Sequence, residues 1–131
     1  MTKKQVVKNW IFKADKDLET AKVLFKLGRY EWCLYIWHLA IEKVIKARFI
    51  VTNKEMPYIH NLTRLAKHAG HVLKETEAQQ LKEITTFNIE ARYDDYKLSF
   101  YKKATRDYAK KWQSICNSLY NKLKDDIYER H

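Results

Sequence analysis

Hydrophobic residues along most of the chain recur at spacings of three and four, the period of an α-helix that buries one face. Between residues 2 and 27 this face consists of Trp10, Ile11, Ala14, Leu18, Ala21, Leu24 and Phe25. Gly28 follows directly and is expected to end the helix, because glycine readily adopts the left-handed conformation found just beyond helix C-termini. The first predicted element is therefore one long amphipathic helix.

A second helix is predicted from Tyr30 to about Val51, after a connection so short that the two helices should form an antiparallel hairpin. Its apolar surface extends too far around the helix for a single partner. That surface consists of Cys33, Ile36, Trp37, Ala40, Ile41, Val44, Ile45 and Ala47. We expect the second helix to lie centrally in a bundle or at a subunit interface.

The helical period is lost between residues 52 and 59, where Pro57 disfavours helix at the residue before it. A short helix is predicted next, with Asn61 as its N-cap and Gly70 as its stop. Its buried face should be Leu62, Leu65, Ala66 and Ala69.

The second half of the chain predicts two further helices. One should begin near residues 75–77 and end near Arg92. Residues 92–96 place turn-forming acids between aromatics and predict a structured loop. A last helix should run from about Ser99 almost to the C-terminus.

Composition favours a purely helical protein. Two glycines and one proline among 131 residues are too few for the tight turns of a β-sandwich or barrel. The length suits one domain over residues 1–131, and 46% hydrophobic residues suffice for a core. The sequence predicts an all-α, single-domain, antiparallel up-and-down bundle of four to five helices.

Several classes of protein are excluded on similar grounds. The chain has no run of about 18 apolar residues for a membrane span, and residues 1–10 lack the apolar segment of a signal peptide. We therefore expect a cytoplasmic protein without a membrane partner. Cys33 and Cys116 form no CxxC pair and are interpreted as packed thiols. Glycine-rich phosphate loops, nucleophile elbows and HExxH motifs are missing from the sequence, so no metal or cofactor is predicted.

Five short motifs follow one another along the chain. Residues 38–47 (HLAIEKVIKA) look like a QAAEKALKA signature. The other four are 14–21 (A-x-x-D-L-x-x-A), 27–30 (a G-R/K-Y turn), 60–65 (H-D/N-L-x-x-L) and 91–93 (A-R-Y). In this order and spacing they resemble the HEPN domains, a family of small helical domains, over about residues 10 to 125.

The resemblance implies an antiparallel helical bundle, often a homodimer, with one of two activities. Some members are metal-independent ribonucleases with an Arg-x(4–6)-His motif beside the loop before the last helix, and these commonly act as toxins. Others are nucleotide- or RNA-binding accessory partners of a separately encoded minimal nucleotidyltransferase.

The residues themselves weigh on this choice. Metal-independent RNA cleavage needs a base that titrates near neutral pH and a cation that stabilises charge developing on phosphorus. Arg92 occupies the family's position for the cation, but residues 93–99 contain no histidine. His60 or an acid of the pair 94–95 could replace the missing base. In simpler interpretations His60 binds the preceding loop or a helix end, and the acids cap the last helix or pair with Arg92.

Two other histidine arrangements occur in the sequence. Arg64 and His71 match the motif spacing, but Gly70 should end that helix and the place in the fold differs. His68 and His71 lie three residues apart, yet no acid or cysteine converges on them in sequence as a metal site would require.

The resemblance also indicates which side chains would bind a nucleotide. Glu42 and Lys46 form an i,i+4 pair of a kind that usually stabilises a helix surface, and Lys43 lies beside them. Tyr93 and Tyr96 are of interest because family members are associated with nucleotide transfer onto a tyrosine near this loop. The predicted nucleotide-binding set is Glu42, Lys43, Lys46, His60, Arg92, Tyr93 and Tyr96.

A formal net charge of +10 is the second functional signal. One stretch near the C-terminus combines basic and aromatic residues, namely Lys102, Lys103, Arg106, Lys110 and Lys111 with Tyr101 and Tyr108. Such a face suits phosphate-backbone binding, a solvated helix surface or an acidic protein partner.

The sequence thus predicts a nucleotide- or RNA-binding accessory module that resembles HEPN domains. It would act as a homodimer with a nucleotidyltransferase, in a toxin–antitoxin-like pair, without catalysis of its own. The alternative is a divergent metal-independent endoribonuclease with Arg92 and His60 as its candidate catalytic residues. A third interpretation is a helical protein whose only task is assembly.

Overall fold

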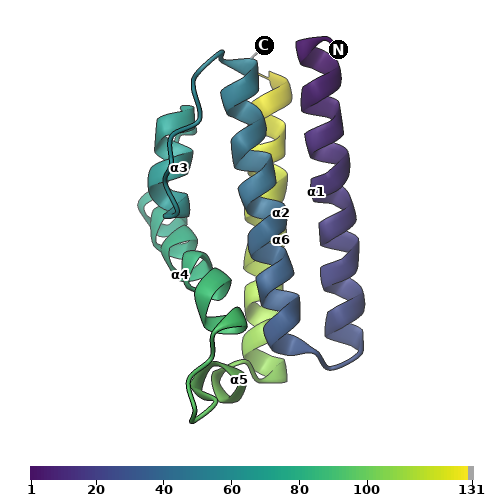
Figure 1. The fold of residues 1–131 in the computed structure, drawn as a ribbon, viewed down its shortest axis with the longest axis vertical. Helices are drawn as coiled ribbons and strands as arrows, with labels where there is room; N and C mark the ends of the chain where they lie inside the picture. Colours follow the sequence, from purple (N-terminus) through teal and green to yellow (C-terminus); the bar gives the residue numbers. More distant parts are fainter. Residues whose placement is uncertain (130–131) are drawn as a thin grey trace.

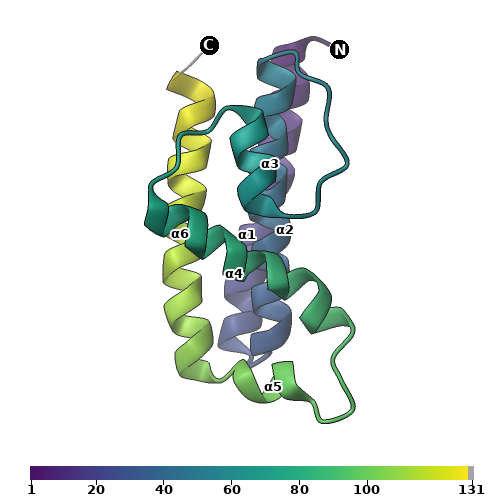
Figure 2. The same cartoon turned by 90° about the vertical axis from the view of Figure 1, so that its left-hand side faces the viewer.

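The computed structural model describes residues 1–129, which form six helices and no strand (Figure 1). The helices are α1 (Lys3–Lys26), α2 (Tyr30–Val51), α3 (Leu62–Ala69), α4 (Glu75–Arg92), α5 (Ser99–Lys103) and α6 (Arg106–Glu129). The all-α bundle predicted from the sequence is confirmed. The three long helices α1, α2 and α6 run side by side, and α4 passes obliquely across α2 and α6 on the side away from α1 (Figure 2).

The hairpin of α1 and α2 forms where the sequence predicts it. Thr2 caps α1 by accepting a hydrogen bond from the backbone N–H of Gln5, whose side chain bonds back to the backbone of Thr2. Gly28 has a φ of 75°, the left-handed conformation that lets the chain leave α1 and enter α2 at once.

The central position expected for α2 is also confirmed. It contacts α1, α3, α4, α5 and α6, and eleven of its residues are buried. Trp37 is completely buried, and its indole N–H donates to Oε1 of Gln113 on α6 at 2.9 Å. The wide apolar surface read from the sequence is therefore covered within the single chain.

The short helix α3 has the caps and the buried face that the sequence predicts. The Asn61 side chain accepts from the backbone N–H of Arg64 at 3.1 Å, and Gly70 ends the helix with a φ of 93°. The backbone N–H of Leu62 donates to Oγ1 of Thr85 at 3.0 Å, which ties α3 to α4.

The predicted last helix is wrong in one respect, because it is two helices. The chain leaves helical geometry at Ala104, and Oγ1 of Thr105 accepts from the backbone N–H of Tyr108 at 3.2 Å, a new N-cap that starts α6. Phe100 and Ala104 are both buried, so their helical spacing continues across the break and hides it in the sequence.

The cysteines are packed thiols, as predicted. Both are buried, and the thiol of Cys33 lies 3.4 Å from Oε1 of Gln113. Burial raises the pKa of Cys33 to about 12 and also raises the pKa of Cys116. Between residues 1 and 129, none of the helices combines the length and hydropathy that crossing a membrane requires.

Candidate functional site: a cationic cleft between α2 and α4

Four of the predicted nucleotide-binding residues converge on one cleft. It has a volume of about 310 Å³ and lies between α2, the loop before α3 and the last turns of α4. Its lining residues are Tyr35, His38, Leu39, Glu42, Lys46, Pro57, Tyr58, Ile59, His60, Asn88 and Arg92. This volume falls in the range of small-molecule sites in proteins.

One face of α2 forms a wall of the cleft. Tyr35, His38, Glu42 and Lys46 are spaced by three and four residues, so the turns of the helix stack them along one stripe. Nζ of Lys46 lies 3.4 Å from Oε1 of Glu42, which confirms the predicted i,i+4 pair. The two opposite charges partly neutralise each other at the wall.

Arg92 faces this stripe from the C-terminal turn of α4. Its Nε–H donates to the backbone carbonyl of Asn88 at 3.0 Å. Its guanidinium carbon lies 5.6 Å from the ring centre of Tyr35 and 5.1 Å from that of Tyr93. Among residues 1–129, Arg92 forms no ion pair, and as an exposed residue it can present its terminal nitrogens to solvent.

The loop before α3 contributes His60 to the cleft. The His60 ring is exposed and makes an edge contact with Tyr58, with ring centres 5.5 Å apart. The next residue, Asn61, is held as the N-cap of α3, so the position of His60 is set by the start of a helix that packs on α2 and α4.

The three other predicted residues lie elsewhere. Lys43 points to the opposite side of α2, where its ammonium pairs with Asp17 of α1. Tyr93 is 71% exposed and touches Arg92, and Tyr96 is 90% exposed with the ammonium of Lys97 above its ring. The lining of the cleft therefore includes Glu42, Lys46, His60 and Arg92. It does not include Lys43, Tyr93 or Tyr96.

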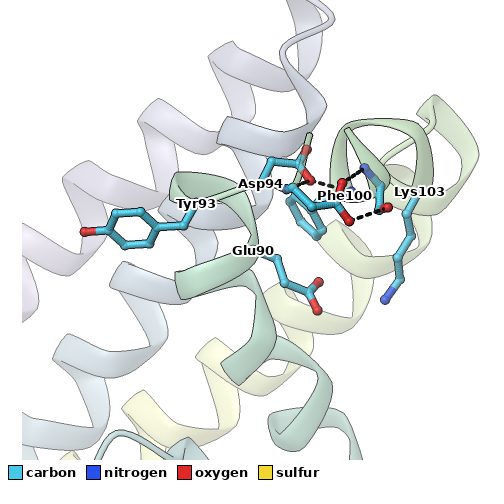
Figure 3. Close-up of a pocket in the computed structure, with 7 residues that line it drawn as sticks. Glu90, Tyr93, Asp94, Phe100 and Lys103 are labelled. Carbon is cyan, nitrogen blue, oxygen red and sulfur yellow. Dashed lines mark hydrogen bonds between the residues drawn. The ribbon is translucent and has the colours of Figure 1, made fainter. Parts of the chain in front are cut away.

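A second hollow of about 240 Å³ lies beside the loop that joins α4 to α5 (Figure 3). Asp94 uses both carboxylate oxygens there, accepting from the backbone N–H groups of Phe100 and Tyr101 at 2.9 Å. Tyr93 points away from Asp94 and Lys103 in this view. The Asp94 carboxylate in this hollow thus caps the N-terminus of α5, and both of its oxygens already accept hydrogen bonds from the backbone.

Asp95 is engaged in the same way. It accepts from the backbone N–H of Ser99 at 2.9 Å and from its hydroxyl at 2.7 Å, and the Ser99 bonds hold the pKa of Asp95 below its ordinary value. The acids of the pair 94–95 cap α5 and do not pair with Arg92. The helix they cap is the short one created by the break at Ala104.

The other histidine arrangements are also located. His71 is buried, with Nδ1 3.2 Å from Oδ2 of Asp126 on α6, whereas Arg64 is exposed on α3. Over residues 1–129, no three His, Cys, Asp or Glu side chains are grouped in a way that could hold a metal ion.

The basic stretch of α5 and α6 is exposed but partly engaged with aromatic rings. Arg106 lies over the ring of Phe25 at 6.0 Å, and Lys111 lies 6.0 Å from the ring centre of Trp112. Lys103 pairs with Glu83 of α4 at 3.2 Å. These charges do not line the cleft.

Sequence reasoning missed Tyr35, His38 and Asn88. His38 is the residue of most chemical interest, since it is 1% exposed and neither ring nitrogen has a hydrogen-bond partner within residues 1–129. Its spacing of three from Tyr35 and four from Glu42 was a signal that could have placed it on the same stripe.

Comparison with known proteins agrees with this architecture. The crystal structure of TT1696 from Thermus thermophilus matches with a TM-score of 0.77 at 15% sequence identity, over 91% of this chain and 96% of that one. No curated protein matches the sequence significantly. The family model described as HEPN domain matches residues 7–126. Because this match spans nearly all of the bundle and includes all five motifs, the chain belongs to the HEPN domain family.

Proposed function

We propose that this protein is a nucleotide- or RNA-binding accessory module that acts, as a homodimer, with a separately encoded nucleotidyltransferase in a toxin–antitoxin-like pair. The observation that carries the proposal is the cleft in which Arg92, Lys46 and His60 converge beside the ring of Tyr35. Cations next to an aromatic ring form a typical setting for a phosphate joined to a nucleoside.

The charges in the cleft assign a role to each group. Lys46 is partly neutralised by Glu42, so Arg92 supplies the main attraction for a phosphate. The Glu42 carboxylate is suited to accept a hydrogen bond from a ribose hydroxyl. The exposed lysine and arginine residues of α5 and α6, together with the net charge of +10, suit an RNA backbone or an acidic partner protein.

Binding tests the first half of the proposal. Fluorescence anisotropy with a labelled mixed-sequence single-stranded RNA, and calorimetry with nucleoside monophosphates, should give micromolar-range affinities that fall as salt rises. Arg92→Ala should weaken binding about tenfold or more. Arg64→Ala removes an exposed arginine outside the cleft and should behave like the wild type. Affinity equal at low and high salt, or insensitive to Arg92→Ala, would contradict a phosphate-led site.

Co-purification tests the partner. A nucleotidyltransferase encoded next to this chain should bind it in a gel-filtration experiment, and the complex should weaken at high salt because the charge of this chain is strongly positive. Elution as separate species at low salt would remove the partnership from the proposal.

A second candidate function, metal-independent RNA cleavage, is favoured by one observation: Arg92 and His60 line the same cleft. His60 would take the proton of a ribose 2′-OH, the 2′-oxygen would attack phosphorus, and the 5′-oxygen would leave with a proton from water. RNA cleavage in EDTA that is lost in both Arg92→Ala and His60→Ala would establish this function. RNA that stays intact with the wild-type protein and with both variants would exclude metal-independent RNA cleavage.

A further inference from the structure

His38 is an unusual residue for the interior of a helical bundle. It is 1% exposed, yet neither Nδ1 nor Nε2 makes a hydrogen bond to any of residues 1–129. Nearly all buried polar atoms in proteins have a partner, because leaving one unpaired costs about 1–3 kcal/mol. His38 is thus a buried ring without a hydrogen-bond partner in this part of the chain, and it lies at the lining of the cleft.

The surroundings of His38 keep its ring neutral. Burial is the main cause that lowers its pKa to about 4, and Arg92 and Lys46 lower it further while Glu42 raises it. Nε2 lies 3.9 Å from Oε2 of Glu42, beyond hydrogen-bond distance. At pH 7 one ring nitrogen is therefore a donor and the other an acceptor.

We propose that His38 determines the specificity of the cleft by hydrogen bonding to the uncharged part of a nucleotide, its base or its ribose, while Arg92 holds the phosphate. This inference rests on the proposed function and extends it. A phosphate only accepts hydrogen bonds at neutral pH and is best served by cations, whereas a base edge or a hydroxyl offers both donors and acceptors to a neutral imidazole. The cleft thus selects nucleotides over phosphate alone.

The ring of Tyr35 lies against the ring of His38 at the lining of the cleft. The two rings are stacked, with centres 6.5 Å apart and an interplanar angle of 15°. The guanidinium of Arg92 also rests on Tyr35, and Arg92 is exposed. A nucleotide whose base or ribose displaces the ring of Tyr35 would come into contact with the imidazole, whereas inorganic phosphate at Arg92 leaves the Tyr35–His38 stack in place.

Two variants separate the hydrogen-bonding role from packing. His38→Phe keeps a planar ring but removes both nitrogens, and His38→Gln keeps a donor and an acceptor. The probes for calorimetry at pH 7.5 are AMP, GMP, CMP and UMP, with ribose 5-phosphate and inorganic phosphate as competitors. His38→Phe should weaken at least one nucleotide about tenfold and leave inorganic phosphate unchanged, and His38→Gln should recover part of the loss. An equal loss for ribose 5-phosphate identifies the ribose as the contact, and no loss identifies the base.

A second measurement does not depend on a variant. In the wild-type protein with ¹⁵N-labelled histidine rings, the signals of His38 should shift on addition of the nucleotide that binds best, but not on addition of inorganic phosphate. Thermal unfolding followed by circular dichroism establishes that each variant is folded. Nucleotide binding that depends on Arg92 but leaves His38→Phe and the ring signals unchanged overturns this inference alone. A wild-type protein that binds neither nucleotide nor RNA overturns the proposed function with it.

Discussion

The guanidinium carbon of Arg92 lies 5.6 Å from the ring centre of Tyr35, so the last turn of α4 meets the first half of α2 through a cation–π contact. The two residues are 57 positions apart in the sequence. Both residues line the cleft, and Arg92 is the only lysine or arginine of that lining that has no carboxylate partner among the described residues.

Replacing Tyr35 should therefore lower both the affinity for a nucleotide and the stability of the fold. Tyr35→Leu removes the ring that positions Arg92, and we expect a several-fold loss of nucleotide affinity with a loss of about 1 kcal/mol in the free energy of unfolding. Tyr35→Phe keeps the ring and is the matched control. Urea unfolding and calorimetry measure the two effects, and equal affinities of the Leu and Phe variants would exclude a positioning role for the ring.

The two glycines should differ in their tolerance of a side chain. Both have positive φ, so alanine is strained at either position by about 1 kcal/mol. A Cβ at Gly28 meets no atom within 4 Å, but a Cβ at Gly70 lies 3.3 Å from Nε and Nη2 of the buried Arg48. Gly70→Ala should cost at least about 1 kcal/mol more than Gly28→Ala in urea unfolding. Equal costs would show that Arg48 moves freely aside.

The cap of α5 predicts a local effect. Asp94→Ala leaves the backbone N–H groups of Phe100 and Tyr101 without their acceptor, at a cost of about 1 kcal/mol. Amide hydrogen exchange at these two positions should become roughly fivefold faster, with little change in α1. Asp94→Asn retains a side-chain oxygen, so its exchange rates at these two positions should lie between those of the wild type and of Asp94→Ala. Unchanged exchange rates of the Phe100 and Tyr101 amides in Asp94→Ala would show that Asp94 does not cap α5.

His38 predicts a pH dependence of stability. Its pKa is about 4 in the folded protein against 6.5 for an ordinary histidine, so between these values the unfolded chain binds a proton that the folded chain does not. The free energy of unfolding should fall as pH is lowered from 6.5 to 4, by up to roughly 3 kcal/mol from this residue.

The control for this effect is His38→Phe, which has no titrating group at the position. The difference in free energy of unfolding between wild type and variant, measured by urea at pH 7, 6, 5 and 4, isolates the contribution of His38 because the other acidic and histidine groups are common to both proteins. A difference that stays constant over this range would contradict a buried neutral imidazole.

Much of the fold could be predicted because its signals are local. A helix boundary depends on a few adjacent residues: Asn61 and Gly70 bound α3, and Gly28 separates α1 from α2, as the sequence predicts. The break at Ala104 was missed because buried Phe100 and Ala104 keep the helical period while Thr105 starts a new cap. The spacing of hydrophobic residues indicates which positions are buried, and the buried positions keep their helical spacing across the break between α5 and α6.

The site was predictable only within single helices. The pairing of Glu42 with Lys46 follows from the helical period, but neighbouring Lys43 lies on the side of α2 that faces α1 and pairs with Asp17. Which of two nearby lysines enters a cleft depends on the positions of other helices. No local pattern contains that information.

The sequence by itself determined an all-helical chain, most of its helix ends and its membership of a family of helical bundles, because periodicity, caps and motifs act over short distances along the chain. The tertiary structure alone decided that Arg92, His60 and Lys46 share one cleft and that His38 lies there buried and unpartnered among the described residues. The physical reason is that a site is a property of distances between elements, and these distances are set by how α2, α3 and α4 pack.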